Sequence, residues 1–250
     1  MSQSQNKRGR RFIVAAGSSG RDILSLSLLL QRFNYEVFIA NTAAQALERI
    51  SADRPALVIT DLALPDMSGM DFFQKLRKTQ GEKSIPVIFM VPSGDAAAES
   101  RCLGYGAAGC ITKPVHAEEL YWTVQHTIEP IPRSSMRIGA HMPVSVDNLP
   151  LDCRAGECGI DLSEDGIRVP LDKPYPRNKR VTVQFHMKDR TISAESSVVY
   201  CNTGNSGHSV SPGMGLKFTT IAPQDKEFIR KFIRDEVVRD VNEALTSQYP

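Results

Sequence analysis

An alternation of short apolar runs with helical patterns fills the first half of the chain and constrains its fold most strongly. Segments such as Asp22–Phe33 and Ala43–Ile50 repeat apolar residues at helical spacing. Between such segments, five runs are typical of strands: Phe12–Ala16, Tyr35–Ala40, Ala56–Asp61, Pro86–Val91 and Gly109–Thr112. Strands that alternate with helices form a parallel sheet covered on both faces. We therefore expect residues 11–129 to form a doubly wound α/β domain with a five-stranded parallel sheet.

The second half of the chain changes to an alternation with a period of two. Val181, Val183 and Phe185 face one way and the residues between them face the other. Further short strands are expected in three places: Ile192–Tyr200, Val144–Leu151 and Gly215–Phe218. A helix is expected over Asp225–Leu245. These patterns predict that residues 138–250 form a small antiparallel six-stranded β-barrel with a C-terminal helix.

A segment without periodicity separates the two patterns. Residues 130–137 read PIPRSSMR, with two prolines and two serines, which is typical of a linker. The same segment holds Arg133 and Arg137 four residues apart. An arginine fork can grip a guanine edge at O6 and N7, or a phosphate, and its plane can stack on a base.

A short polar turn follows these arginines. Asp161, Ser163 and Gly166 stand in GIDLSEDGIRV, where Asp and Ser supply hydrogen-bonding groups and Gly permits a positive φ or a close backbone approach. Together with the arginines, the turn indicates a site for a ligand that bears guanine and phosphate. The alternative is an ordinary polar turn between two strands. A second such arginine pair, Arg230 and Arg234, falls inside the predicted helix and is interpreted as its solvated face.

These residues, R-x-x-x-R followed by D-x-S-x-x-G, resemble the PilZ domain, a bacterial receptor for cyclic di-GMP. The resemblance covers roughly residues 130–245 and includes PGMGLKF at 212–218, which is similar to a late strand of that family. It implies that the residues of both motif halves bind cyclic di-GMP. Pro132 replaces a further arginine found in many members, which leaves the number of bound ligands open.

The first half resembles a response-regulator receiver domain over residues 11–129. The resemblance rests on VITDLALPDMSGMDF, which contains Asp61, on the strand IPVIFMV, and on GAAGCITKPV, which contains Lys113. It implies a flavodoxin-like strand order, with Asp61 in the phosphoacceptor position and Lys113 as its cationic partner.

Several positions depart from the receiver pattern. The acidic pair that holds Mg²⁺ after the first strand is replaced by Ala16 and Gly17. The hydroxyl residue that ends the fourth strand is Val91, and the switch aromatic is Cys110. Mg²⁺ requires hard oxygen ligands, so this receiver is expected to be degenerate. Asp61 then has two interpretations: an inherited aspartate paired with Lys113, which we favour, or an acceptor of phosphate from a histidine kinase.

Composition excludes several classes of protein. Net charge is +2, with 41% hydrophobic and 23% charged residues, as in globular domains without a nucleic-acid-binding face. No apolar run is long enough for a membrane span, and the basic residues 1–10 are expected to be a disordered tail. The cysteines are expected to be free thiols in a reducing cytosol: Cys102, Cys110, Cys153, Cys158 and Cys201. The histidines are scattered, so neither a metal centre nor a catalytic site is expected.

The sequence therefore predicts a cytoplasmic bacterial signalling protein that is not an enzyme and needs no cofactor. We expect cyclic di-GMP to bind at Arg133, Arg137, Asp161, Ser163 and Gly166. The degenerate receiver would relay binding to a protein partner; a homodimer is left open. The resemblance implies roles in motility, pili, exopolysaccharide or development. Two alternatives stay open: a phosphorylation-controlled response regulator and a ligand-independent scaffold.

Overall fold

The computed structural model describes residues 12–80, 84–151, 158–203 and 212–248. The chain divides into two compact units, and the division falls between Arg133 and Ser134. The second unit comprises Ser134–Val237. This division lies inside the segment predicted as a linker, residues 130–137. The predicted tail at residues 1–10 lies outside the described residues.

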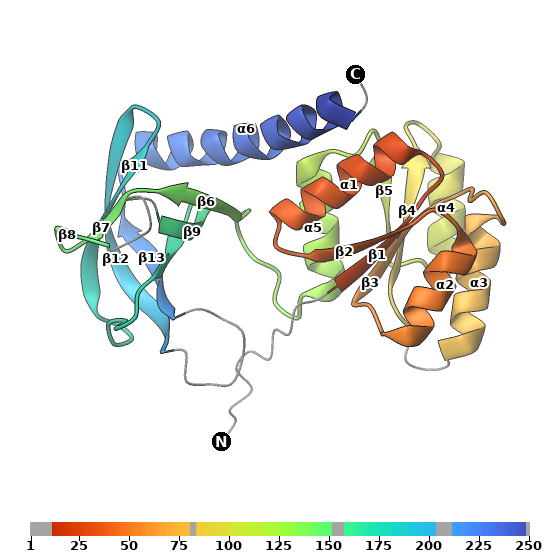
Figure 1. Ribbon diagram of the computed structural model, residues 1–250, viewed down its shortest axis with the longest axis horizontal. Coiled ribbons are helices and arrows are strands. Elements are labelled where there is room, and N and C mark those ends of the chain that lie inside the picture. Colours follow the sequence, from red (N-terminus) through yellow and green to blue (C-terminus); the bar gives the residue numbers. More distant parts are fainter. Residues whose placement is uncertain (1–11, 81–83, 152–157, 204–211, 249–250) are drawn as a thin grey trace. The chain divides into compact units, whose positions relative to one another are not determined.

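The first unit contains a five-stranded parallel sheet in the order β2-β1-β3-β4-β5 (Figure 1). Its strands are β1 Phe12–Ala16, β2 Glu36–Ala40, β3 Leu57–Asp61, β4 Val87–Pro92 and β5 Gly109–Lys113. This order is the flavodoxin-like doubly wound arrangement. The predicted fold class is confirmed, and the predicted strands agree with these bounds to within one residue.

Helices cover both faces of this sheet, α1 and α5 on one and α2, α3 and α4 on the other (Figure 1). Their bounds are α1 Gly20–Arg32, α2 Ala43–Ala52, α3 Gly69–Gln80, α4 Ala96–Gly104 and α5 Ala117–Ile128. Short polar side chains begin three of them: Ser19, Thr42 and Asp95 each accept a hydrogen bond from a backbone N–H of the first turn. The core is mostly aliphatic and includes Phe73 and Phe89, whose rings lie edge to face at 5.8 Å.

The second unit is a curled antiparallel sheet in the order β6-β9-β10-β13-β12-β11-β7-β8. The strands are β6 Ile138–Met142, β7 Val144–Val146, β8 Leu149–Pro150, β9 Cys158–Ser163, β10 Gly166–Pro170, β11 Arg180–Met187, β12 Arg190–Asn202 and β13 Gly213–Thr220. The single strand expected over Val144–Leu151 is instead a hairpin of β7 and β8. Asp147 and Asn148 adopt φ values of 51° and 63°, which turn the chain between them.

The C-terminal helix, α6, runs from Pro223 to Gln248 and confirms the helix predicted over Asp225–Leu245. Ile229, Ile233 and Val237 recur every four residues and are buried. The β11–β12 hairpin packs on the same helix. There, the Arg190 guanidinium lies 5.3 Å from the Phe228 ring centroid, and Lys188 Nζ lies 5.5 Å from that of Phe232.

The composition led to expectations about the cysteines, metal binding and membrane spans. Cys102, Cys110 and Cys201 are free thiols, whereas the side chains of Cys153 and Cys158 lie outside the described residues. Among the residues with described side chains, no group of three or more His, Cys, Asp and Glu gathers where a metal ion could be held. No helix in the described ranges combines the length and apolar character of a membrane span.

Candidate functional site

Asp61 and Lys113 meet at the carboxyl edge of the parallel sheet. Asp61 ends β3 with only 3% of its surface exposed, and Lys113 ends β5. Their side chains form an ion pair, and the Ser18 N–H donates to Asp61 Oδ2 at 3.1 Å. Lys113 Nζ also lies 3.2 Å from Asp22 Oδ2, in the first turn of α1. The structure thus brings together the pair expected from the sequence and adds Asp22 to it.

The charges around Lys113 favour its protonated form. Burial alone would lower the pKa of Lys113, but the carboxylates of Asp61 and Asp22 outweigh burial and raise the pKa. Lys113 therefore remains a cation at neutral pH and neutralises the buried carboxylate of Asp61.

The residues at the end of β1 carry no acidic side chains. Ala16 is fully buried at the end of β1. A Cβ atom built on Gly17 would lie 2.8 Å from Ile23 Cδ1 and 2.9 Å from Asp61 Oδ2, so a side chain there would require its neighbours to move. Val91 is buried near the end of β4. The side chains at the three positions (16, 17 and 91) therefore supply no oxygen atom next to Asp61.

In the second unit, strand β9 carries Asp161 and Ser163 between β6 and β10. Asp161 lies opposite Gly139 of β6, and Ser163 lies opposite Gly166 of β10. Residues two apart on a strand share a face. The alternate residues, Ile160 and Leu162, are buried in the core. Asp161 and Ser163 therefore belong to the outer face of the sheet.

The turn between β9 and β10 is held by its own residues. The Ser163 hydroxyl is buried and donates to the Gly166 carbonyl oxygen at 3.1 Å. Gly166 does not have a positive φ. It is needed because β13 approaches closely: a Cβ atom there would overlap the Leu216 carbonyl group and lie 3.3 Å from Lys217 Cα. Of the two reasons considered from the sequence for this glycine, close backbone approach is the one observed.

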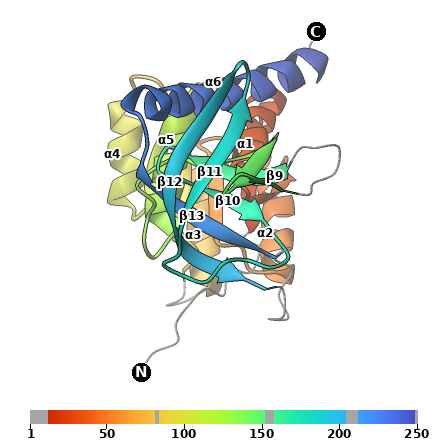
Figure 2. The same ribbon diagram turned by 90° about the vertical axis from the view of Figure 1, so that its left-hand side faces the viewer.

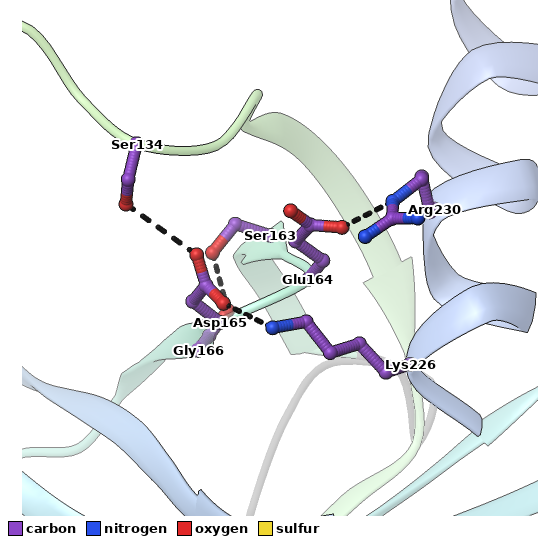
Figure 3. A network of polar contacts seen from close by, with 7 residues as sticks. All are labelled: Ser134, Ser163, Glu164, Asp165, Gly166, Lys226 and Arg230. Atoms are coloured by element: carbon purple, nitrogen blue, oxygen red, sulfur yellow. Dashed lines mark hydrogen bonds and ion pairs between the residues drawn. The ribbon is translucent and has the colours of Figure 1, made fainter. Parts of the chain in front are cut away.

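Two basic residues of α6 hold the same turn from outside (Figure 3). Lys226 Nζ lies 2.7 Å from Asp165 Oδ1, and the Arg230 guanidinium is bonded to the Glu164 carboxylate. The Ser134 hydroxyl donates to Asp165 Oδ2 at 3.4 Å. Arg230 and Arg234 are exposed on α6, as predicted for a solvated helix face, but Arg230 also pairs with Glu164 of the turn. The sequence did contain a signal for these contacts: two adjacent acidic residues in the turn, Glu164 and Asp165, and two basic residues four apart on the helix, Lys226 and Arg230.

The charge of Asp165 reflects these contacts. Burial would raise the pKa of Asp165, but hydrogen bonds from Lys226, Ser135 and Ser134 outweigh burial and lower the pKa. The ionised carboxylate of Asp165 therefore binds Lys226 of α6 and Ser134, the residue that follows Arg133.

The two motif arginines fall on different sides of the division between the units. Arg133 ends the N-terminal segment of the first unit, and its N–H donates to Gln125 Oε1 at 3.4 Å. Gln125 in turn donates to the Tyr35 hydroxyl at 2.8 Å. Arg137 precedes Ile138, which pairs with Leu162, so the register places Arg137 beside Ser163. Within the second unit, Arg137 thus directly precedes β6, which pairs with the strand that carries Asp161 and Ser163, and that strand pairs with β10, which begins at Gly166.

The pKa of Tyr35 reflects its burial beside Gln125. Burial, and then the nearby Glu129 carboxylate, raise the pKa of Tyr35 to about 12. The Tyr35 hydroxyl therefore stays protonated and accepts a hydrogen bond from Gln125. This bond fixes the Gln125 side chain of α5, which in turn accepts from the Arg133 N–H.

Family models match both halves of the chain. One describes the response regulator receiver domain and matches residues 22–125; the other describes the PilZ domain and matches residues 132–235. The fold and these matches define a two-domain signalling protein. Its first domain is a receiver, its second is a PilZ domain, and the chain belongs to the response regulator family.

Curated relatives match the receiver half. The two-component response regulator ORR3 of Oryza sativa subsp. indica is 31% identical over 109 residues, which cover 43% of this chain and 83% of that protein. ORR7 of Oryza sativa subsp. japonica is 30% identical over 110 residues, which cover 44% of this chain. The match covers 52% of ORR7, so the chain spans about half the length of that relative.

Solved structures give similar matches. A putative response regulator from Chloroflexus aurantiacus is 24% identical, with a TM-score of 0.46, and the match covers 48% of this chain and 98% of that one. The chemotaxis response regulator CheY4 of Vibrio cholerae is 25% identical, with a TM-score of 0.44, and the match covers 48% of this chain and 99% of CheY4.

Proposed function

We propose that this chain is a cytoplasmic signalling effector that binds cyclic di-GMP through its PilZ domain and relays binding to a protein partner through its receiver domain. The observation that carries the proposal is the placement of Arg137 directly before β6, next to β9 with Asp161 and Ser163 and to β10 with Gly166. The match of the PilZ family model to residues 132–235 supports the identity of the ligand.

The chemistry of these groups suits a guanine dinucleotide. Arg133 and Arg137 would each present a planar fork to a guanine edge or a phosphate. The Asp161 carboxylate is an acceptor and suits the N–H donors of guanine. Gly166 keeps the turn close to β13, so the ligand meets backbone there rather than a side chain.

The relay would act through the linker. Arg133 is bonded through its backbone to Gln125 of α5, and the next residue, Ser134, is bonded to Asp165 of the turn. A ligand that engages the Arg133 side chain would bias these contacts. Such a switch requires the ligand to contact one linker arrangement better than others.

The receiver would then work without phosphorylation. The residues present do not fit Mg²⁺, because Ala16 and Gly17 offer no side-chain oxygen and Asp61 is already paired with Lys113. The domain would serve as a docking surface for the partner. The observation that favours the alternative, a phosphorylation-controlled regulator, is the burial of Asp61 beside Lys113 at the phosphoacceptor position.

Titration calorimetry with cyclic di-GMP tests the proposed function. The wild-type chain should bind, and Arg137→Ala should lose about 2 kcal/mol or more of binding free energy, roughly thirtyfold in affinity. The matched control is Arg177→Ala, because Arg177 is an exposed turn residue of the same unit. Arg230 is unsuitable as a control, since it contacts Glu164 of the turn. Absent wild-type binding, or equal losses in both variants, would overturn the proposal.

A further inference from the structure

A buried glutamine of the receiver bonds to the backbone of the first motif arginine. Gln125 lies on α5 and is only 2% exposed. Its amide oxygen, Oε1, accepts a hydrogen bond from the Arg133 N–H at 3.4 Å. Its amide nitrogen, Nε2, donates to the Tyr35 hydroxyl at 2.8 Å. Both ends of this buried side chain therefore have partners, and one partner is the backbone of a residue that we propose to bind the ligand.

The receiver core fixes Tyr35, the partner at the other end. Tyr35 lies between α1 and β2 and is buried, and its N–H donates to the Leu30 carbonyl oxygen at 3.0 Å. The end of α1 lies beside α5 (Figure 2), where the Phe33 and Tyr121 rings meet edge to face at 4.9 Å. Backbone bonding and packing thus hold the tyrosine that holds the Gln125 amide.

Arg133 is held weakly, on both sides of its own Cα atom. Its N–H bond to Gln125 and the bond from the next residue, Ser134, to Asp165 of the motif turn are both 3.4 Å long. The Arg133 charge also reaches the receiver. Burial and then the Glu129 carboxylate raise the pKa of Tyr35 to about 12, and the nearby Arg133 guanidinium offsets part of this effect.

This arrangement bears on the free energy of ligand binding. A ligand that grips the Arg133 fork also restricts the backbone of that residue, and ordering a mobile backbone opposes binding. A hydrogen-bond acceptor that is already in place offsets part of this cost. Gln125 supplies such an acceptor from a packed helix, and its Oε1 would lie buried without a donor if Arg133 moved away.

We propose that Gln125, held by Tyr35, is a positioning residue of the cyclic di-GMP site, through which the receiver core raises the ligand affinity of the PilZ domain. The Arg133 N–H keeps its bond to Gln125 Oε1 when the ligand binds, and the bond tightens. This inference rests on the proposed function, because Arg133 is one of the residues assigned to that ligand. By linkage, the ligand in turn stabilises the receiver contacts of Gln125.

Two substitutions at Gln125 separate positioning from a purely structural role. Gln125→Met keeps the length of the side chain but removes the acceptor, whereas Gln125→Glu keeps an oxygen acceptor for the Arg133 N–H. Both replace a buried amide, so both should lower the stability of the receiver. In calorimetry on the full chain with cyclic di-GMP, Gln125→Met should bind about fivefold more weakly, which corresponds to one net hydrogen bond of about 1 kcal/mol. Gln125→Glu should bind like wild type.

A control and a second variant accompany this pair. Ile50→Val changes the core under α2, on the opposite face of the sheet, and should lower stability without changing ligand affinity. Tyr35→Phe removes the acceptor that holds Gln125 Nε2, so it should weaken binding in the same direction as Gln125→Met. Amide exchange measured by NMR gives a direct readout: the ligand should protect the Arg133 N–H in wild type and in Gln125→Glu, but not in Gln125→Met.

The outcomes distinguish this inference from the proposed function. Wild-type affinity in Gln125→Met, with binding still lost in Arg137→Ala, would refute the positioning role and leave the proposed function standing. Tighter binding in Gln125→Met would also refute it, because Gln125 would then hold Arg133 away from the ligand. Equal weakening in Gln125→Met, Gln125→Glu and Ile50→Val would assign the effect to receiver stability instead. Absent wild-type binding would refute both proposals.

Discussion

At Asp61, the carboxylate already has its partners: the Lys113 ammonium and the Ser18 N–H. Gly17 has no room for a metal-binding side chain without movement of Ile23 or Asp61. We expect incubation with acetyl phosphate and Mg²⁺ to give no stable phosphoryl adduct by intact-mass measurement. A robust adduct of one phosphoryl group in wild type that disappears in Asp61→Asn would show that the receiver is phosphorylated.

The same ion pair predicts a stability effect. Lys113→Met leaves the Asp61 carboxylate buried without its cation. Because Lys113 is partly exposed, we expect a loss of about 1–3 kcal/mol in the free energy of unfolding of the receiver. Urea denaturation measures this loss, and Asp61→Asn in the same chain should recover part of it. A double variant no more stable than Lys113→Met would mean that the pair does not account for the loss.

At the scale of elements, α6 is tied to the motif turn through Glu164 and Asp165. A carboxyl group with a lowered pKa stabilises the fold above its ordinary pKa, and this contribution is lost as pH falls through the lowered value. Asp165 should therefore contribute below about 1 kcal/mol at neutral pH, since Lys226 is partly exposed, and nothing in strong acid.

Asp165→Asn tests this contribution. The variant should be less stable than wild type at pH 7, and the difference should shrink as pH falls below the ordinary pKa of an aspartic acid. Urea denaturation at several pH values measures the difference, with Lys231→Ala on the exposed surface of α6 as the control. A difference that persists unchanged in acid would point to packing rather than charge.

The elements differ in how well the sequence predicts them. Strands β1, β3 and β4 are predictable because each is a largely apolar run buried on both faces of the parallel sheet. Strands β6, β9 and β10 escaped prediction because each holds few large apolar residues, and because glycines such as Gly139, Gly159 and Gly166 are also typical of turns. The motif residues were identifiable from their spacing. The contact of Arg230 with Glu164 was not, because it depends on how the distant C-terminal helix packs.

At the scale of the whole molecule, two adjacent linker residues bond to different units: Arg133 to Gln125 of the first and Ser134 to Asp165 of the second. The Arg133 N–H bond to Gln125 is long, at 3.4 Å, and therefore weak. No helix or strand covers residues 130–137. Ordering a mobile residue costs about 1–2 kcal/mol, which lowers the net affinity for a ligand that orders the linker.

Hydrogen exchange of the full chain, with and without cyclic di-GMP, tests the central claim most directly. The account predicts that linker amides within residues 130–137 exchange quickly without ligand and become protected with it, together with the turn at residues 161–166. The β11 strand, Arg180–Met187, should change little. Linker amides that are already protected in the free protein, or that stay unprotected at saturating ligand, would contradict the proposed switch.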